Sequence, residues 1–537
     1  MDFIFGTWST DELKLIHHRA TRRGLQHHGT ITPRDPQPGQ PVIVDALTGG
    51  DFHADHVALY YTTDGSLPAG SYGVAANGIA LSMDRVTIEW DSISWAYLTH
   101  WRATIPAQPD GAVVHYRISA WSDTNGSEET FANFPDSQQI VEVAASNYFK
   151  KLPMPVDYTP GDRCGEVFTY HVDSFRSPQW ARDAVIYHIF VDRFYPGDGK
   201  TWTQTSDLYG FCGGTLWGII DQLDYIEKLG VNCIWLSPTW ESPSHHGYDV
   251  TDYCKTEIRL GGDDALRALV QAAHARGIRV LLDLVCNHIS NENPIFQSAL
   301  NDVDSPYRDW FIWNDSSIGY RTFFAVATMP QVNLTNPGAK KWMLDIARYW
   351  LQEFDVDGYR LDYANGPNPQ FWWEFRAACR EAKPDSFIFG EVVEAPDNIA
   401  HYIGRLDGCL DFHIGEALRR TFGWRTMSEQ ALDEFIAHHQ LYFPTDFVMP
   451  SFVDNHDMDR FLWIAEGDKE ALKRAAAYQL KLPNPPIIYY GTEVGLSQER
   501  STHGNGLHMS RTPMLWGDDQ DTEMLAYYKQ LIQARQK

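Results

Sequence analysis

Positive charge is scarce in this sequence. Lys and Arg together number 44 against 70 Asp and Glu, and the formal net charge is −26 at pH 7. A surface with this surplus repels phosphate groups, so nucleic acids and anionic membranes are poor partners for it. We therefore expect a small or neutral binding partner.

Long apolar runs are also missing. No segment reaches the roughly 18 apolar residues of a membrane span. The first residues, MDFIFGTWSTDELKL, do not have the basic and apolar regions of a signal peptide. These absences predict a soluble, cytoplasmic protein that does not bind a membrane.

Cysteine and nucleotide-binding motifs are sparse as well. The seven cysteines are scattered and form no CxxC pair, which predicts neither a disulfide framework nor a zinc site. No GxGxxG string opens a helix and no Walker loop is present, so no nucleotide or redox cofactor is predicted. Aromatic residues, in contrast, are abundant, with 19 Trp, 26 Tyr and 27 Phe. They are enough to fill a large core and to line a binding cleft.

The N-terminal part predicts a domain of β-strands. Over residues 41–150, short alternating or aromatic-rich runs separated by turn residues are typical of an immunoglobulin-like β-sandwich. Residues 1–40 are expected to be a polar lead-in segment. Residues 151–180, which begin with a Pro-rich stretch, are expected to be a linker. Four tryptophans of the sandwich are expected in its core: Trp90, Trp95, Trp101 and Trp121.

From residue 181 to 537 the pattern changes to alternating strands and helices. Eight apolar strand-like runs are separated by helix-period stretches, which predicts an α/β fold, the (β/α)8 TIM barrel. About fifty residues separate the third strand from its helix, and a loop of this length is usually functional. We expect residues 289–336 to form a subdomain inserted after strand 3 that covers the barrel mouth. Its aromatic residues Trp310, Trp313, Phe323 and Phe324, with Tyr248, are expected to face a neutral sugar.

Polar residues follow several of the predicted strands at their carboxyl ends. A single carboxylate in such a place commonly caps the next helix. Three of them, however, come from three strands whose ends point toward one axis. The set comprises Asp283, Asn287 and His288 after the third strand, Arg360 and Asp362 after the fourth, Glu391 at the fifth, and His456 and Asp457 after the seventh.

Such a set matches the needs of glycoside hydrolysis. One carboxylate attacks the anomeric carbon, and a protonated carboxylic acid roughly 5 to 5.5 Å away donates to the leaving oxygen. Arg360 precedes Asp362 by two residues and therefore points to the same side of a strand, so we expect it to lower the pKa of Asp362. Neighbouring carboxylates are expected to raise the pKa of Glu391.

Five strings carry a family resemblance. They are DLVCNH (283–288), MPQVN (329–333), GYRLDYANG (358–366), GEVVE (390–394) and FVDNHD (452–457), and HHGYDVTDY (245–253) precedes them. In order and position they resemble the motifs of the α-amylase family, glycoside hydrolase family 13. The resemblance implies that Asp362 is the nucleophile, Glu391 the general acid and base, and Asp457 the carboxylate that stabilises the transition state. It also implies four substrate-binding residues: Tyr248, His288, Arg360 and His456.

The string MPQVN is similar to those of the neopullulanase, cyclomaltodextrinase and maltogenic amylase group and of intermediate groups. This implies a retaining α-glucan hydrolase that cleaves α-1,4 bonds, with α-1,6 bonds as a further target, in maltooligosaccharides, cyclodextrins, pullulan or starch. Two alternatives stay open: an enzyme that transfers or isomerises glucosyl units of maltose, sucrose or trehalose, and a non-catalytic glucan-binding protein. Gly366, Val393 and Glu394 depart from the group, and the usual C-terminal β-domain is expected to be absent.

Two further expectations rest on the resemblance alone. Members often carry calcium, and Asn287 matches a ligand of the site beneath the long third loop, while Asp198 lies in a segment similar to a second calcium loop. Gly366 and Thr215 stand where further ligands are usual, so calcium is admitted without being required. The N-terminal domain is expected to offer a surface for a homodimer.

Overall fold

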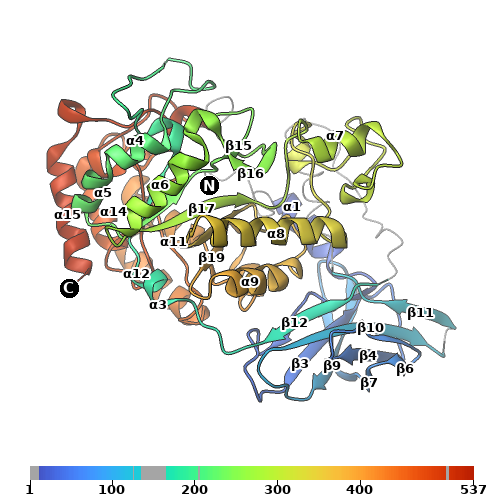
Figure 1. The fold of residues 1–537 in the computed structure, drawn as a ribbon. Coiled ribbons are helices and arrows are strands. Elements are labelled where there is room, and N and C mark those ends of the chain that lie inside the picture. The colour runs from blue at the N-terminus through green and yellow to red at the C-terminus, as the bar shows by residue number, and fades with distance from the viewer. Residues whose placement is uncertain (1–10, 125, 135–164, 204–205, 503–506, 537) are drawn as a thin grey trace.

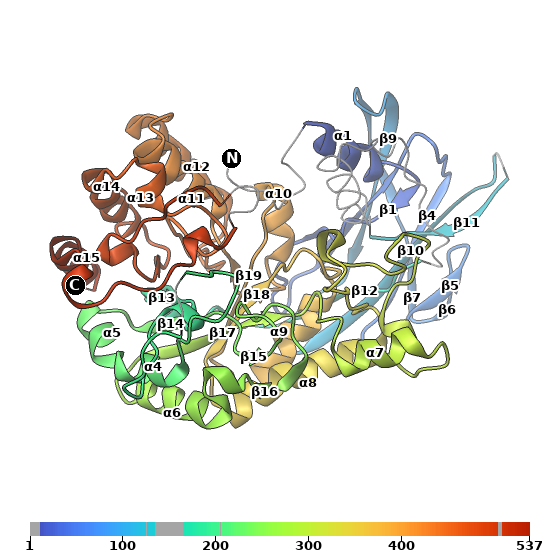
Figure 2. The same ribbon diagram turned by 90° about the horizontal axis from the view of Figure 1, so that it is seen from above.

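The chain folds into two parts that lie side by side (Figures 1 and 2). The computed structural model describes residues 11–124, 126–134, 165–203, 206–502 and 507–536. The start of the expected lead-in segment, the end of the expected sandwich and the Pro-rich start of the expected linker lie outside these residues. The last helix, α15 (Thr522–Arg535), lies on the side of the barrel away from the N-terminal strands.

The N-terminal part is a β-sandwich, as the sequence predicts. Its strands are β1 (Leu25–Gln26), β2 (Ile31–Thr32), β3 (Val42–Thr48), β4 (His56–Thr62), β5 (Ala69–Ser71), β6 (Val74–Asn77), β7 (Ile79–Ser82), β8 (Asp84–Asp91), β9 (Ala96–Ile105), β10 (Ala112–Ser122), β11 (Ser127–Phe131) and β12 (Phe168–Val172). One antiparallel sheet has the order β1-β3-β9-β8, with β2 on β3. The other has the order β11-β10-β4-β7, with β12 on β10. Alternating burial along β3 places Val42, Val44 and Ala46 between the sheets.

Both segments expected to flank the sandwich contribute structure to it. The lead-in range forms helix α1 (Asp11–Ala20) and the strands β1 and β2, which pair with β3. The strand β12 lies in the range expected as a linker, but it pairs with residues 112–116 of β10. This part of the linker prediction is therefore wrong, because the alternating pattern of FTYHV is that of a half-buried strand.

The four sandwich tryptophans divide into two kinds. Trp101 is buried in the core, and Trp121 is half-buried and stacks on His56 with ring centroids 5.1 Å apart. Trp90 and Trp95 are 44% and 78% exposed, so the expectation that they lie in the core is wrong. Both belong to the β8–β9 hairpin, and β8 is an edge strand whose residues Asp84–Trp90 are all exposed.

The second part is the predicted barrel. Its parallel strands are β13 (Ile186–Ile189), β14 (Cys233–Leu236), β17 (Arg279–Val285), β18 (Gly358–Asp362), β19 (Phe387–Gly390), β20 (Gly408–Cys409) and β21 (Ile487–Tyr489). They are hydrogen-bonded in the order β20-β19-β18-β17-β14-β13-β21. The predicted seventh strand is present as parallel bridges, from Val448 to Gly408 and from Ser451 to Asp411 and Pro486. These bridges join β20 to β21 and close the ring. Most strand residues are buried, because helices cover the outer face of the ring and side chains fill its interior.

Helices alternate with the strands, as the pattern of the sequence predicts, and one further helix lies in the inserted subdomain. They are α3 (Gln179–Arg182), α4 (Leu216–Asp221), α5 (Leu223–Leu229), α6 (Gly262–His274), α7 (Pro294–Asn301), α8 (Pro337–Glu353), α9 (Phe371–Ala382), α10 (Pro396–Ile399), α11 (Phe412–Leu418), α12 (Glu429–Tyr442), α13 (Phe461–Ile464), α14 (Lys469–Gln479) and α15. In α8, Asn336 is the N-cap and Pro337 is at the first turn, as expected for a helix start. None of the described helices combines the length and the apolar content needed to cross a bilayer.

The insertion after β17 is a compact subdomain built on the helix α7 and an aromatic cluster. Phe296 packs against Phe311, Trp313 and Tyr320, with ring centroids 4.8 to 6.2 Å apart. The hairpin of β15 (Trp240–Glu241) and β16 (Asp252–Thr256) contacts the start of this insertion, because the backbone N–H of Ser290 donates to the oxygen of Val250 at 3.0 Å. The subdomain returns to the barrel through a bridge between His288 and Gln331. Its position is therefore tied to the carboxyl end of β17.

One tryptophan joins the two parts. Trp373 belongs to α9 of the barrel but is 2% exposed within the hydrophobic core of the sandwich. Its ring stacks on His171 of β12 at 5.7 Å. Beside it, the backbone N–H of Thr169 donates to the side-chain oxygen of Gln370 at 2.9 Å. The sandwich is thus fastened to the barrel by apolar burial and by hydrogen bonds.

Candidate active site

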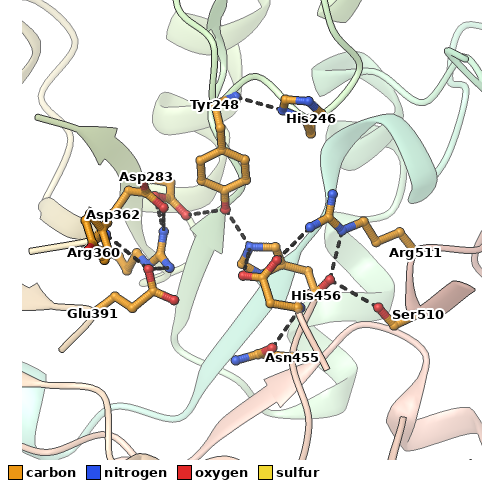
Figure 3. A network of polar contacts seen from close by, with 12 residues as sticks. His246, Tyr248, Asp283, Arg360, Asp362, Glu391, Asn455, His456, Ser510 and Arg511 are labelled. Atoms are coloured by element: carbon orange, nitrogen blue, oxygen red, sulfur yellow. Dashed lines mark hydrogen bonds and ion pairs between the residues drawn. The ribbon is translucent and has the colours of Figure 1, made fainter. Parts of the chain in front are cut away.

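The predicted polar residues meet at the carboxyl ends of the barrel strands (Figure 3). The parallel register puts Asp283 opposite Arg360 and Val285 opposite Asp362, while Leu361 pairs with Gly390, the residue before Glu391. His456 and Asp457 arrive from the loop after the seventh strand position, and Tyr248 from the loop between β15 and β16. The three carboxyl groups predicted to take part in cleavage therefore lie together with Tyr248, Arg360 and His456.

Arg360 is at the centre of this cluster. Its Nη1 lies 2.7 Å from Asp283 Oδ1 and 3.0 Å from Asp362 Oδ1, and its Nη2 lies 2.8 Å from Glu391 Oε2. The guanidinium is 1% exposed and also lies 5.3 Å from the centre of the Trp235 ring. One fixed positive charge therefore holds three carboxyl groups in place. The two carboxyls proposed for chemistry are bound to neighbouring nitrogens of the same group.

Burial dominates the acidity of these two carboxyls. It raises the pKa of Asp362 to about 7 against the opposing attraction of Arg360. In the same way it raises the pKa of Glu391 to about 7. The expectation that Asp362 has a lowered pKa is thus wrong, because the desolvation of a largely buried carboxylate outweighs the lowering by Arg360, whose charge is shared among three acids. The two groups also repel each other and titrate as a pair.

Asp457 has the opposite environment. Arg511 Nη2 lies 2.6 Å from its Oδ1 and His456 Nε2 lies 2.9 Å from its Oδ2. Although burial alone would raise the pKa of Asp457, His456 and Arg511 together lower it well below its usual value. This carboxylate is therefore ionised near neutral pH, whereas burial raises the pKa of Asp362 and of Glu391 to about 7. The side of the site that holds Asp362 and Glu391 thus differs in protonation from the side that holds Asp457.

Tyr248 connects the carboxyl groups around Arg360 with His456, the neighbour of Asp457. Its hydroxyl donates to Asp283 Oδ2 at 3.1 Å and lies 2.6 Å from His456 Nε2. The Tyr248 and His456 rings are nearly parallel, with centroids 5.6 Å apart. Figure 3 shows the tyrosine between Asp283 on one side and His456 and Arg511 on the other. Its ring orientation is therefore fixed from both sides.

His288 lies on the wall formed by the inserted subdomain. Its ring stacks on Phe323 at 4.7 Å, and Phe323 in turn contacts Tyr363, the residue after Asp362. The backbone N–H of Tyr363 donates to Glu391 Oε2 at 3.0 Å, with a left-handed φ of 42°. Of the rings expected at the mouth, those of Phe323 and Phe324 lie against site residues.

The two tryptophans of the inserted subdomain have a different place. Trp313 packs under the guanidinium of Arg308, which lies 3.4 Å from the ring centre, and Trp310 contacts Tyr307 and Trp342. They support the subdomain rather than the site, so this part of the expectation about aromatic residues is not met.

Sequence reasoning missed Arg511 and Ser510. Arg511 Nε also donates to the backbone oxygen of His456 at 2.8 Å, and the Ser510 hydroxyl donates to the same oxygen at 3.1 Å. Both residues follow β21 by about twenty positions in an irregular segment, where neither periodicity nor motif spacing predicts a role. Only the fold brings them to Asp457.

The residues considered for calcium do not fit that ion. The side-chain oxygen of Asn287 accepts a hydrogen bond from the Gln331 amide at 2.7 Å. Asp198 is exposed in another loop, where it lies 3.6 Å from Lys200. Within the described ranges, no three His, Cys, Asp or Glu side chains gather as metal ligands would. A calcium ion takes six to eight oxygen ligands, and the oxygen that Asn287 would offer is already engaged by the Gln331 amide.

The fold and the site define the class of this protein: a (β/α)8 barrel with clustered carboxyl groups at the carboxyl ends of its strands. The profile described as "Alpha amylase, catalytic domain" matches residues 188–534. The chain therefore belongs to the alpha-amylase family, as its motifs predict.

Two curated relatives and one solved structure illustrate the similarity. "Alpha-amylase 2" of Dictyoglomus thermophilum is 42% identical over 368 residues, which cover 68% of this chain and 65% of that protein. A cyclomaltodextrinase of Geobacillus thermopakistaniensis is 36% identical, covering 69% and 65%. A solved structure named cyclomaltodextrinase has a TM-score of 0.64 at 28% identity, covering 96% of this chain and 84% of that one. Other relatives are named maltogenic amylase and neopullulanase, which confirms the expected group.

Proposed function

We propose that this protein is a retaining α-glucan hydrolase. The matches span about 65% of the length of the first curated relatives, so its activity is argued from its own site. The observation that carries the proposal is the shared guanidinium of Arg360, which binds Asp362 and Glu391 through neighbouring nitrogens. Retaining hydrolysis needs two carboxyl groups placed so closely that one can attack while the other donates a proton.

The proposed reaction has two steps. Asp362 attacks the anomeric carbon as a carboxylate, and Glu391 gives its proton to the glycosidic oxygen as that bond breaks. A water molecule then attacks the same carbon, Glu391 takes its proton, and the bond to Asp362 breaks. The ionised Asp457 would stabilise positive charge on the sugar ring, and Tyr248, His288, Arg360 and His456 would hold its hydroxyls and its apolar face.

The substrate class proposed here is a neutral α-glucan. The first relatives named above are called alpha-amylase and cyclomaltodextrinase, and a similar solved structure is titled cyclic alpha-maltosyl-(1→6)-maltose hydrolase from Arthrobacter globiformis, at 31% identity and a TM-score of 0.62. These names support maltooligosaccharides, cyclodextrins, pullulan or starch over sucrose or trehalose. One relative from Bacillus subtilis is named intracellular maltogenic amylase, which supports a cytoplasmic location.

Replacement of the nucleophile tests the proposal. Asp362→Asn should leave the melting temperature close to that of the wild type and should lower turnover of β-cyclodextrin and maltotriose by about four orders of magnitude or more, because no covalent intermediate can form. With wild-type enzyme, proton NMR should show the α-anomer as the first product. Wild-type activity in the variant, or the β-anomer as first product, would refute the proposed mechanism.

We also propose that the N-terminal domain forms a homodimer through the β8–β9 hairpin. Ile88, Trp90, Trp95 and Tyr97 are 44% to 78% exposed on this hairpin. Trp90 contacts Trp95 and Tyr97 with ring centroids 5.0 to 5.1 Å apart, so the exposed rings form one patch. Exposed apolar patches mark interaction sites, and an unpaired edge strand beside one favours pairing with an identical edge about a twofold axis.

A further inference from the structure

Arg460 is a buried cation that follows Asp457 by three residues in the same loop, at the N-cap of α13. It is 0% exposed. Its guanidinium carbon lies 4.5 Å from the centre of the Tyr489 ring and 5.0 Å from that of Tyr490. Burial of a positive charge is unfavourable unless polar groups and aromatic faces replace the water around it. The contacts of Arg460 therefore show what its charge holds in place.

The guanidinium of Arg460 joins two distant stretches of backbone. Its Nε donates to the oxygen of Ser510 at 3.1 Å, and its Nη1 donates to the oxygen of Tyr490 at 3.0 Å. The Tyr489 hydroxyl lies 3.2 Å from the same Ser510 oxygen. A guanidinium presents its donors in a rigid planar fork, so two carbonyl groups bound together keep a fixed relative position. Arg460 thus holds the backbone at Ser510 against the end of β21.

Ser510 and Arg511 in turn bind the loop that carries Asp457 (Figure 3). The Ser510 hydroxyl and Arg511 Nε both donate to the backbone oxygen of His456, at 3.1 and 2.8 Å. His456 precedes Asp457 and Arg460 follows it. The loop is therefore joined to Ser510 and Arg511 on both sides of Asp457.

The bond between Arg460 and the Ser510 oxygen fixes the starting point of the Arg511 side chain. The oxygen of Ser510 and the N–H of Arg511 belong to one planar peptide group, and that N–H donates to the oxygen of His508 at 3.0 Å. Arg511 then uses Nε for the backbone and Nη2 for Asp457, at 2.8 and 2.6 Å. Since both bonds come from one rigid group, a shift of this peptide would disturb both.

We propose that Arg460 is a positioning residue that binds the Ser510 oxygen and so directs Arg511 toward Asp457. The consequence for the reaction rests on the proposed function, in which Asp457 stabilises positive charge on the sugar ring, whereas the hold on Arg511 does not. Arg460 itself lies behind Arg511 and acts only through it. Its removal should therefore matter for catalysis only while Arg511 is present.

The first experiment follows Arg511 without substrate. In protein labelled with nitrogen-15 in arginine, the Nε–H signal of Arg511 is assigned by its loss in Arg511→Met. This N–H is bonded to the backbone of His456 in a buried place, so its exchange with solvent should be slow in the wild type. Exchange should be at least about tenfold faster in Arg460→Met, because the peptide before Arg511 is then released. An unchanged exchange rate in Arg460→Met would overturn the proposal.

Arg380 offers a matched control at the opposite end of the barrel strands. It is 3% exposed, donates to the backbone oxygen of Pro384 at 2.8 Å and lies 2.6 Å from Asp407, just before β20. Arg380→Met also removes a buried guanidinium and should lower the melting temperature. It should leave both kcat and the exchange rate at Arg511 unchanged. Equal effects of the two substitutions at Arg511 would show that lost stability alone is responsible and would refute the positioning role.

The second experiment is a double-mutant cycle with maltotriose as substrate. Arg460→Met should lower kcat about tenfold and change KM by less than about twofold, because Asp457 acts mainly in the transition state. In protein that already carries Arg511→Met, the same substitution should change kcat by less than about twofold, because the residue through which it acts is missing. Additive effects of the two substitutions would refute the proposal.

Arg460→Lys serves if Arg460→Met does not fold, because it keeps the buried charge and a donor for one carbonyl group. A single ammonium group cannot replace the planar fork, so kcat should fall about threefold, and this fall should again vanish with Arg511→Met. The same fall in both backgrounds would contradict the proposal. If Asp362→Asn kept wild-type activity while loss of Arg460 still accelerated exchange at Arg511, the proposed function would fail and this inference would stand. An inactive Asp362→Asn with unchanged exchange would have the reverse meaning.

Discussion

At the scale of single residues, the site is organised by burial more than by individual ion pairs. Asp362 and Glu391 both bind Arg360, yet the pKa of each is raised to about 7 by desolvation. Both sit next to one charge, so their environments do not by themselves assign nucleophile and acid. That division comes from the family motif. What the environment supplies is a pair that holds one proton near neutral pH.

This pair predicts the pH dependence of the reaction. Below the raised pKa values, Asp362 also takes a proton and can no longer attack, so kcat should fall on the acid side. Above them, Glu391 loses its proton and cannot protonate the leaving oxygen, so kcat should fall on the alkaline side. Steady-state rates on maltotriose should therefore give a bell with its maximum close to neutral pH. A rate that stays constant from about pH 4 to pH 6 would show that Asp362 has an ordinary pKa and would contradict this reading.

Arg511 carries the second residue-scale prediction. It bonds to Asp457 at 2.6 Å and is 3% exposed, and a buried hydrogen bond to a charged group contributes about 1.5 to 3 kcal/mol. Arg511→Met should therefore lower kcat/KM by about tenfold to a hundredfold. The control is Arg474→Met, because the side chain of Arg474 is 59% exposed. If the two variants behave alike, Arg511 does not position Asp457.

At the scale of elements, the apolar strand runs predicted the barrel because parallel strands are buried on both faces and need continuous apolar sequence. The exception is the seventh strand, which consists of isolated bridges at Val448 and Ser451. The positions of Asp362, Glu391 and Asp457 at the site were also predictable, because in a barrel the carboxyl ends of all the strands lie on the same face. The contact of Arg511 with Asp457 and the exposure of Trp95 were not predictable, because both depend on how segments far apart in the sequence pack.

The helix α9 gives the element-scale prediction. The side chain of Trp373 extends from the barrel into the core of the sandwich, where it is 2% exposed. Replacement of a buried tryptophan by alanine lowers the free energy of unfolding by about 3 to 5 kcal/mol. Trp373→Ala should lower the melting temperature of the sandwich and split the thermal transition, while Trp373→Phe should do so to a smaller extent. Circular dichroism and calorimetry would record both effects. A single unchanged transition in the alanine variant would show that the sandwich is held by other contacts.

At the scale of the whole molecule, the exposed rings of the β8–β9 hairpin predict the state of association. Stable interfaces bury roughly 1,200 to 2,000 Å² and centre on a few aromatic anchors, and Trp95, at 78% exposed, is the most accessible tryptophan of the described chain. The wild type should be a dimer by light scattering at micromolar concentration, and Trp95→Ser with Tyr97→Ser should give a monomer that keeps its barrel. Leu441→Ser is the matched control, because Leu441 is 85% exposed on α12 of the barrel, and it should stay dimeric. Burial of the hairpin rings is expected to supply most of the free energy of association. A monomeric wild type, or dissociation of the control variant alone, would therefore show that the hairpin is not the interface.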